Sequence, residues 1–181
     1  MKKIIYLIMV LNFIALKPSF LYSQNPAVGG IVYGSDWAFL VSAPDEWIMD
    51  SQSFSHYNIF ALFYENGRTL GVGTPIIYIN TTELALATDE EMKVYIAWDL
   101  GNHNKNGSMI VELNNILNGV NDTYYIYNIE NASGQFETII YRRYRNICFS
   151  IILNAPNENI RQQLFSKMEE VVKSMLFMDR S

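Results

Sequence analysis

The chain has 181 residues, of which 50% are hydrophobic and 14% aromatic, with a net charge of −5 and one cysteine, Cys148. A lone cysteine excludes an intrachain disulfide, so the fold must depend on its apolar core. The acidic balance argues against nucleic acid and against an anionic membrane surface as partners.

The first 23 residues have the pattern of a secretory signal peptide. Lys2 and Lys3 form a positive start, and residues 4–16 are almost entirely apolar. This run is shorter than the roughly 20 apolar residues that span a bilayer, so we expect cleavage near Ser23 rather than a permanent anchor. The sequence therefore predicts export to the periplasm or the medium, with no stable membrane span after cleavage.

Removal of residues 1–23 leaves a chain of a size that fits one domain. Three of the 13 basic residues and none of the 18 acids lie in that segment, which brings the net charge of the remainder to −8. Three glycines and a proline in residues 24–35 predict a flexible leader. We expect a single domain over residues 36–178.

Three strands are expected in the first half of this domain. The alternation of Trp37, Phe39 and Val41 predicts a strand that Pro44 ends, because proline cannot donate to a strand ladder. Residues 47–56 are read as irregular. Residues 57–64 are apolar on both faces, which predicts a central strand, and a shorter strand is expected over residues 74–80.

A helix is expected from Thr88, where Thr88 and Glu91 form a capping box. The apolar spacing of Met92, Tyr95 and Ile96 predicts its buried face, and Gly101 is expected to end it in a polar loop.

An antiparallel meander of four strands is expected to follow from residue 108. Asn118-Gly119, the segment NASG at 131–134 and Arg145-Asn146 supply its turns. Pro156 then opens a last helix with apolar residues at a spacing of 3.6. The pattern predicts an α+β fold with a mostly antiparallel sheet sandwiched by helices on opposite faces.

The stretch LVSAPDEW, residues 40–47, resembles the start of domains in the PsbP-like superfamily. Their usual pattern, P-x-G-W after a short strand, corresponds to Pro44 through Trp47 here, with Glu46 in place of the glycine. The later order is also similar: TDEE opening a helix, the hairpin ETIIYRRYRNICFSIIL and a C-terminal helix ending VVKSMLF. The resemblance implies an α/β/α sandwich in a small exported bacterial protein. It also implies docking to partners, with no catalytic motif to carry over.

Candidate binding residues follow from composition and position. Trp47 is expected to plug the end of the sandwich, and the alternative is stacking against a ligand. Arg142, Arg143 and Arg145 form a basic region that could dock an acidic partner, or a charged edge that discourages strand pairing. Tyr125 and Tyr127 are further candidates, because tyrosine is enriched at interfaces.

Catalytic and metal-binding patterns are weak in this sequence. His56 and His103 are read as loop residues without a paired spacing, and Cys148 as a buried, inert thiol. We expect no metal and no cofactor. A small hydrolase would need both histidines and the acids at 45–46 to converge in one cleft.

Three hypotheses for the function remain. The first is an exported, non-enzymatic protein-binding or accessory module of the bacterial envelope, with an unknown protein partner. The second is a carrier of a small apolar ligand held between the sheet and the helices. The third is the small hydrolase.

Overall fold

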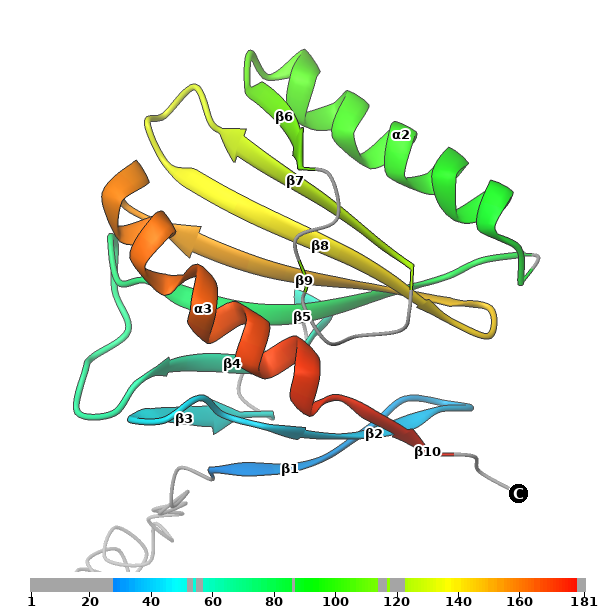
Figure 1. Ribbon diagram of the computed structural model, residues 1–181, viewed down its shortest axis with the longest axis horizontal. Coiled ribbons are helices and arrows are strands. Elements are labelled where there is room, and N and C mark those ends of the chain that lie inside the picture. The colour runs from blue at the N-terminus through cyan, green and yellow to red at the C-terminus, as the bar shows by residue number, and fades with distance from the viewer. Residues whose placement is uncertain are drawn as a thin grey trace, which may run out of the picture.

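The computed structural model describes residues 28–51, 54, 57–85, 87–113, 117 and 123–178. In these residues the chain forms two antiparallel sheets and two helices (Figure 1). The signal peptide, His56 and the Asn118-Gly119 turn of the sequence analysis lie outside the described residues.

The larger sheet has seven strands in the order β3-β4-β5-β9-β8-β7-β6. Its strands are β3 (Trp47–Asp50), β4 (Ile59–Glu65), β5 (Ile76–Glu83), β6 (Met109–Leu113), β7 (Tyr124–Glu130), β8 (Phe136–Tyr144) and β9 (Ile147–Ala155). The smaller sheet, in the order β1-β2-β10, consists of β1 (Gly29–Tyr33), β2 (Ala38–Ser42) and β10 (Leu176–Met178).

The two helices cover opposite faces of the larger sheet, as predicted. The helix α2 (Asp89–Lys105) packs over β6 and β8, with Met92 and Ile96 in a core cluster that includes Cys148. The helix α3 (Glu158–Ser174) and the smaller sheet cover the other face. The α+β sandwich predicted from the sequence is confirmed.

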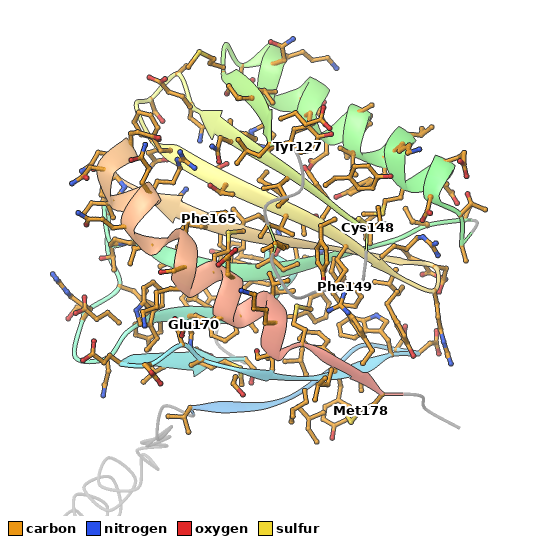
Figure 2. The ribbon with its side chains drawn as sticks, viewed as in Figure 1. Tyr127, Cys148, Phe149, Phe165, Glu170 and Met178 are labelled. Carbon is orange, nitrogen blue, oxygen red and sulfur yellow. The ribbon has the colours of Figure 1, made fainter. Side chains whose placement is uncertain are left out.

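Strand β9 shows why the sheet lies between two cores. Ile147, Phe149, Ile151 and Leu153 face α3, while Cys148 and Ile152 belong to the α2 cluster. Side chains alternate across a strand, so Cys148 and Phe149, both labelled in Figure 2, belong to different layers. The predicted core face of β9 and the meander β6-β7-β8-β9 are both confirmed.

The turn between β2 and β3 contains the Pro-x-x-Trp motif. The Trp47 N–H donates to the Pro44 carbonyl oxygen at 3.0 Å, and Glu46 has a φ of 68°. A positive φ suits glycine, because a Cβ in the left-handed region crowds the backbone. Glu46 therefore adopts a backbone conformation that favours glycine, which is the residue at this position of the PsbP-like pattern.

Two segments that were predicted as irregular are strands. Residues 29–33 of the expected flexible leader form β1, paired with β2 from Gly29↔Ser42 to Tyr33↔Ala38. A Cβ on Gly29 would lie 2.8 Å from the Val41 carbonyl oxygen, so this pairing depends on the missing side chain. Residues 47–50 form β3, in which Trp47, Ile48 and Met49 are all buried and leave no alternation to read.

The position of β4 also differs from the prediction. Successive residues Leu62 and Phe63 are both buried, so the strand is covered on both faces as its pattern indicates. It is nevertheless the second strand from one edge, and β9 is central. A strand with apolar residues on both faces is therefore one that other elements cover on both sides, and it need not be central in the sheet.

Helix α2 begins as predicted and ends later. The Thr88 side chain accepts from the Glu91 N–H at 3.2 Å, and the Glu91 carboxylate accepts from the Ala85 N–H at 2.8 Å. The helix continues through Gly101 to Lys105. A Cβ added to Gly101 would have no neighbouring atom within 4 Å, so no steric contact at this position ends the helix.

Among the described residues, no helix combines the length and the apolarity that crossing a membrane requires.

Candidate docking groove beside strand β6

Strand β6 forms one edge of the seven-stranded sheet and carries exposed apolar side chains. It pairs with β7, and no described strand pairs with its other edge. Met109 is 59% exposed and Val111 is 48% exposed. Because side chains alternate, Met109, Val111 and Leu113 share the face that α3 covers farther along the sheet, and Leu113 packs there against the core.

A groove lies on this face, between β6, β7 and the start of α3. Its volume is about 280 Å³. It is lined by Met109, Val111, Asn128, Ile129, Glu130, Phe136, Glu158 and Arg161. We call this surface the β6 groove.

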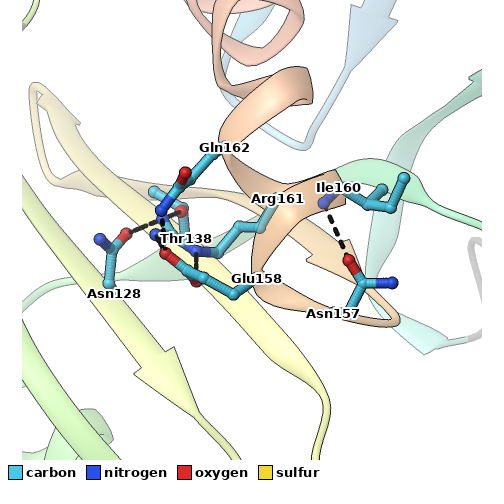
Figure 3. A network of polar contacts seen from close by, with 7 residues as sticks. All are labelled: Asn128, Thr138, Asn157, Glu158, Ile160, Arg161 and Gln162. Atoms are coloured by element: carbon cyan, nitrogen blue, oxygen red, sulfur yellow. Dashed lines mark hydrogen bonds and ion pairs between the residues drawn. The ribbon is translucent and has the colours of Figure 1, made fainter.

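A buried arginine fixes the floor of the β6 groove. Arg161, near the start of α3, is only 7% exposed. Its Nη1 donates to the Thr138 hydroxyl at 2.8 Å and to the Asn128 carboxamide oxygen, and the Thr138 hydroxyl donates to the same oxygen at 2.8 Å (Figure 3). The guanidinium thereby ties α3 to β7 and β8.

Glu158 completes this network from the mouth of the groove. Its carboxylate accepts from Nε and Nη2 of Arg161, which is a two-point ion pair, and also from the Gln162 amide. The hydrogen bond from Arg161 is the main reason that the pKa of Glu158 lies below its ordinary value. The charges of Arg161 and Glu158 compensate each other. The β6 groove therefore has an apolar wall and a polar floor.

Helix capping sets the position of this pair. The Asn157 side chain accepts from the Ile160 N–H at 3.0 Å, which makes Asn157 the N-cap of α3. Glu158 then lies in the first turn, where the helix dipole favours a carboxylate, and Arg161 follows one turn later. The arrangement has the chemistry of a binding surface: apolar contact, an exposed strand edge and fixed polar groups.

Trp47 lies in the core beneath α3. It is 6% exposed and belongs to the main core cluster. It also borders a separate recess of about 210 Å³ together with Glu46, Leu164 and Lys167. Burial agrees with a plug at this end of the sandwich.

The three candidate arginines are divided between different environments. Arg142 lies over the Phe177 ring at 4.5 Å on the α3 side. Arg143 pairs with Asp89 at 2.7 Å and donates to the Ala87 and Arg145 carbonyl oxygens. Arg145 forms the β8–β9 turn with a φ of 55°.

The candidate tyrosines lie on the α2 side. Tyr125 and Tyr127 are half-buried against the α2 core cluster, and Tyr127 meets Tyr141 edge-to-face at 6.0 Å. The structure therefore does not gather Trp47, the arginines and the tyrosines into one site.

The residues proposed for a hydrolase do not converge. His103 lies in the last turn of α2 rather than in an exposed loop. It borders a pocket on the α2 side of the sheet. Glu46 lines the recess beneath α3, on the opposite side of the sheet. Burial raises the pKa of the Cys148 thiol to about 12, so this thiol is protonated at neutral pH and is a weak nucleophile.

Within the ranges that the structure describes, no group of three or more His, Cys, Asp or Glu side chains is placed to hold a metal ion.

The sequence analysis missed the β6 groove. Met109 and Val111 read as ordinary strand residues, because exposure of a face depends on which elements pack against it. Arg161 reads as a solvated helix residue. The signal available was Asn128 and Thr138, two polar residues that share a strand face with the apolar Ile126 and Ile140 and need a partner when buried.

Comparison with known proteins identifies the fold through structure alone. A scan against protein-family models finds no match, and a search of curated proteins finds none either. The solution structure of cyanobacterial PsbP (CyanoP) from Synechocystis sp. PCC 6803 matches with a TM-score of 0.50 at 12% identity, covering 86% of this chain and 96% of that chain. A crystal structure from Bacteroides thetaiotaomicron VPI-5482 matches with a TM-score of 0.43 at 14% identity, over 79% of this chain and 45% of that one. The first match covers most of this chain, and the chain therefore has the PsbP-like α+β sandwich fold that its sequence predicts.

Proposed function

We propose that the protein is an exported, non-catalytic accessory module of the bacterial envelope that binds a protein partner through the β6 groove. The observation that carries the proposal is the exposure of Met109 and Val111 on an edge strand, directly beside a groove with an apolar wall. Exposed apolar side chains gathered in this way mark interaction sites on soluble proteins.

The physical basis of binding is strand addition. An extended segment of the partner would pair with the open edge of β6 through backbone hydrogen bonds. Every second side chain of that segment would then point into the groove. Phe136 and Val111 offer apolar contact, and the Glu158 carboxylate offers a polar partner at the groove mouth.

A non-catalytic role is supported by the same chemistry. The buried groups with raised pKa values, Cys148 and Tyr141, remain protonated at neutral pH, which suits a structural role. The PsbP-like resemblance points in the same direction, because most proteins of that superfamily act by docking.

The apolar-carrier alternative has less support. The space between the sheet and α3 is filled by buried side chains such as Phe149, Ile151 and Met168. The β6 groove itself opens to solvent at Met109 and is smaller than the roughly 300–1,000 Å³ of typical drug-sized ligand sites.

The proposal is tested by charge substitution at the groove. Val111→Lys should abolish recovery of the partner from envelope extract by the tagged protein, because a lysine side chain would face the apolar contact. Val72→Lys is the matched control, since Val72 is fully exposed in a loop far along the chain from β6. Both variants should melt within about 1 °C of the wild type, because exposed substitutions change stability little.

Equal recovery of the same proteins by the wild type, Val111→Lys and Val72→Lys would contradict the proposal. Export is tested separately, by N-terminal sequencing of the mature protein, which should begin near residue 24.

A further inference from the structure

A second pocket lies on the opposite face of the seven-stranded sheet, between α2 and strands β5, β8 and β9. Its volume is about 250 Å³, and polar atoms make up most of its wall. The lining residues that matter for its chemistry are Tyr78, Asn80, Tyr95, Asp99, His103 and Glu137. We call it the α2 pocket.

Two regular patterns bring these side chains together. Tyr95, Asp99 and His103 are spaced four residues apart, so they share one face of α2. On β5, Tyr78 and Asn80 point to the α2 side, because Ile77 and Ile79 fill the core on the other side. Strand β5 is therefore apolar on the face toward α3 and polar on the face toward α2. Because α2 covers only half of the polar face, a polar pocket remains under the helix.

Each carboxylate of the α2 pocket is held by one neutral donor. The Tyr141 hydroxyl donates to Oδ2 of Asp99 at 2.6 Å, and the Asn154 carboxamide donates to Oε1 of Glu137 at 2.9 Å. Neither carboxylate forms an ion pair with a lysine or arginine of the described residues. The α2 pocket therefore contains two carboxylates that no described lysine or arginine pairs with.

Asn80 adds an acceptor that the described residues leave unsatisfied. Its Oδ1 atom is buried, and no donor from the described part of the chain reaches it. A buried acceptor destabilises the fold when nothing donates to it. A ligand that carries N–H donors would relieve this cost after a small rotation of the carboxamide.

Tyr78 lies beside these acceptors, and both carboxylates affect its pKa. Burial is the main cause of the raised pKa of Tyr78, and the negative charges of Glu137 and Asp99 raise it further. Tyr78 thus stays a neutral hydroxyl beside the two carboxylates. Tyrosine rings also attract cations through their faces.

We propose that the α2 pocket binds a small organic ammonium ion, with Asp99, Glu137 and Asn80 accepting its N–H groups. Three acceptors, two of them charged, and an aromatic wall match a compact cation with several donors. A neutral polyol would leave both charges unbalanced, and an anion would be repelled. The proposal concerns a different face from the β6 groove and does not depend on it.

The test uses putrescine as the probe, with 1,4-butanediol as its neutral counterpart of similar length. Calorimetric titration of the purified protein should show saturable binding of putrescine and none of butanediol. Asp99→Asn and Glu137→Gln should each weaken binding by about tenfold, the loss expected for one charge-assisted hydrogen bond. Asparagine can still accept from Tyr141, so the Asp99 variant should keep its fold.

Glu90→Gln is the matched control, because Glu90 is an exposed acid in the first turn of the same helix. It should bind putrescine like the wild type. Four results would overturn the proposal: no binding at about 10 mM putrescine, equal binding of butanediol, binding of calcium with the same dependence on Asp99 and Glu137, or an equal loss of affinity in Glu90→Gln and Asp99→Asn. The last result would mean that the protein attracts cations only through its overall charge.

Discussion

The two faces of the seven-stranded sheet are packed differently. The face under α3 and the smaller sheet is filled by a continuous cluster of apolar and aromatic residues, including Trp37, Phe39 and Phe149. The face under α2 has a smaller apolar cluster, and beside it lies a polar pocket. The α3 face therefore supplies most of the stability, whereas the α2 face leaves polar groups available to a ligand.

The largest effect is expected at Trp47, on the α3 face. Trp47→Ala should lower the free energy of unfolding by about 3–5 kcal/mol, because it removes a buried aromatic side chain from the main core. Denaturant titration measures this loss. A Trp47→Ala protein with unchanged stability would instead favour the ligand-stacking interpretation.

The two faces can be compared directly with neighbouring isoleucines of β9. Ile151→Ala should cost about 4 kcal/mol, because Ile151 is 0% exposed in the α3 core and its removal leaves a closed cavity. Ile152→Ala should cost about 2 kcal/mol, because Ile152 lines the α2 pocket, where the site can be rehydrated. Equal losses of stability would mean that the faces are equally packed.

The buried Arg161 joins α3 to β7 and β8, and its removal tests the polar part of the α3 face. Arg161→Met should lower stability by about 2–3 kcal/mol, because the Asn128 oxygen and the Glu158 carboxylate lose a charged donor. Lys173→Met removes an exposed charge near the other end of α3 and should change stability by less than about 0.5 kcal/mol.

The same network gives a pH dependence with a defined sign. The pKa of Glu158 is lowered in the folded state, so this group stabilises the fold above its unfolded pKa of about 4.3. That contribution is lost as the pH falls through the lower, folded pKa. Stability measured from pH 5 downwards should fall more steeply in the wild type than in Arg161→Met, and parallel curves would contradict the assignment.

A smaller gain is expected in the turn that precedes β3. Glu46→Gly should raise the free energy of unfolding by about 1 kcal/mol, because glycine adopts the observed φ of 68° without steric cost. Asp45 lies in the same turn without a positive φ, so Asp45→Gly should destabilise the protein. If Glu46→Gly also destabilised the protein, the positive φ would not be a source of strain.

The smallest effect is expected in the α2 pocket. Asn80→Ala should change stability by less than about 0.5 kcal/mol, because the lost side chain carries an unsatisfied acceptor that offsets its other contacts. A loss above about 2 kcal/mol would show that Asn80 is satisfied in solution and that the pocket is part of the structural core.

Strong periodicity made much of the fold predictable. Strands β8 and β9 alternate clearly around the Arg145-Asn146 turn, and α3 has a regular apolar stripe. Strand β1 was missed because its glycines pair through the backbone alone. Strand β10 was missed because three residues after a helix carry no period.

The candidate sites were less predictable, because they depend on coverage and on contacts between distant residues. The α2 pocket combines Tyr78, Asp99 and Glu137 from three different elements, and no sequence spacing links them. The alternation of Tyr78 and Asn80 with two buried isoleucines was a visible signal that β5 has a polar face. The covering helix could not be placed over that face from the sequence alone.

The most direct test of the proposed docking role is photo-cross-linking in living cells, with a photoreactive residue at position 111 or at position 72. Both positions carry exposed valines, so accessibility alone should not distinguish them. We predict one major adduct at position 111, none at position 72, and loss of the adduct when Met109 is also changed to lysine. Equal adducts at both positions, or none at position 111, would contradict a partner at the β6 groove.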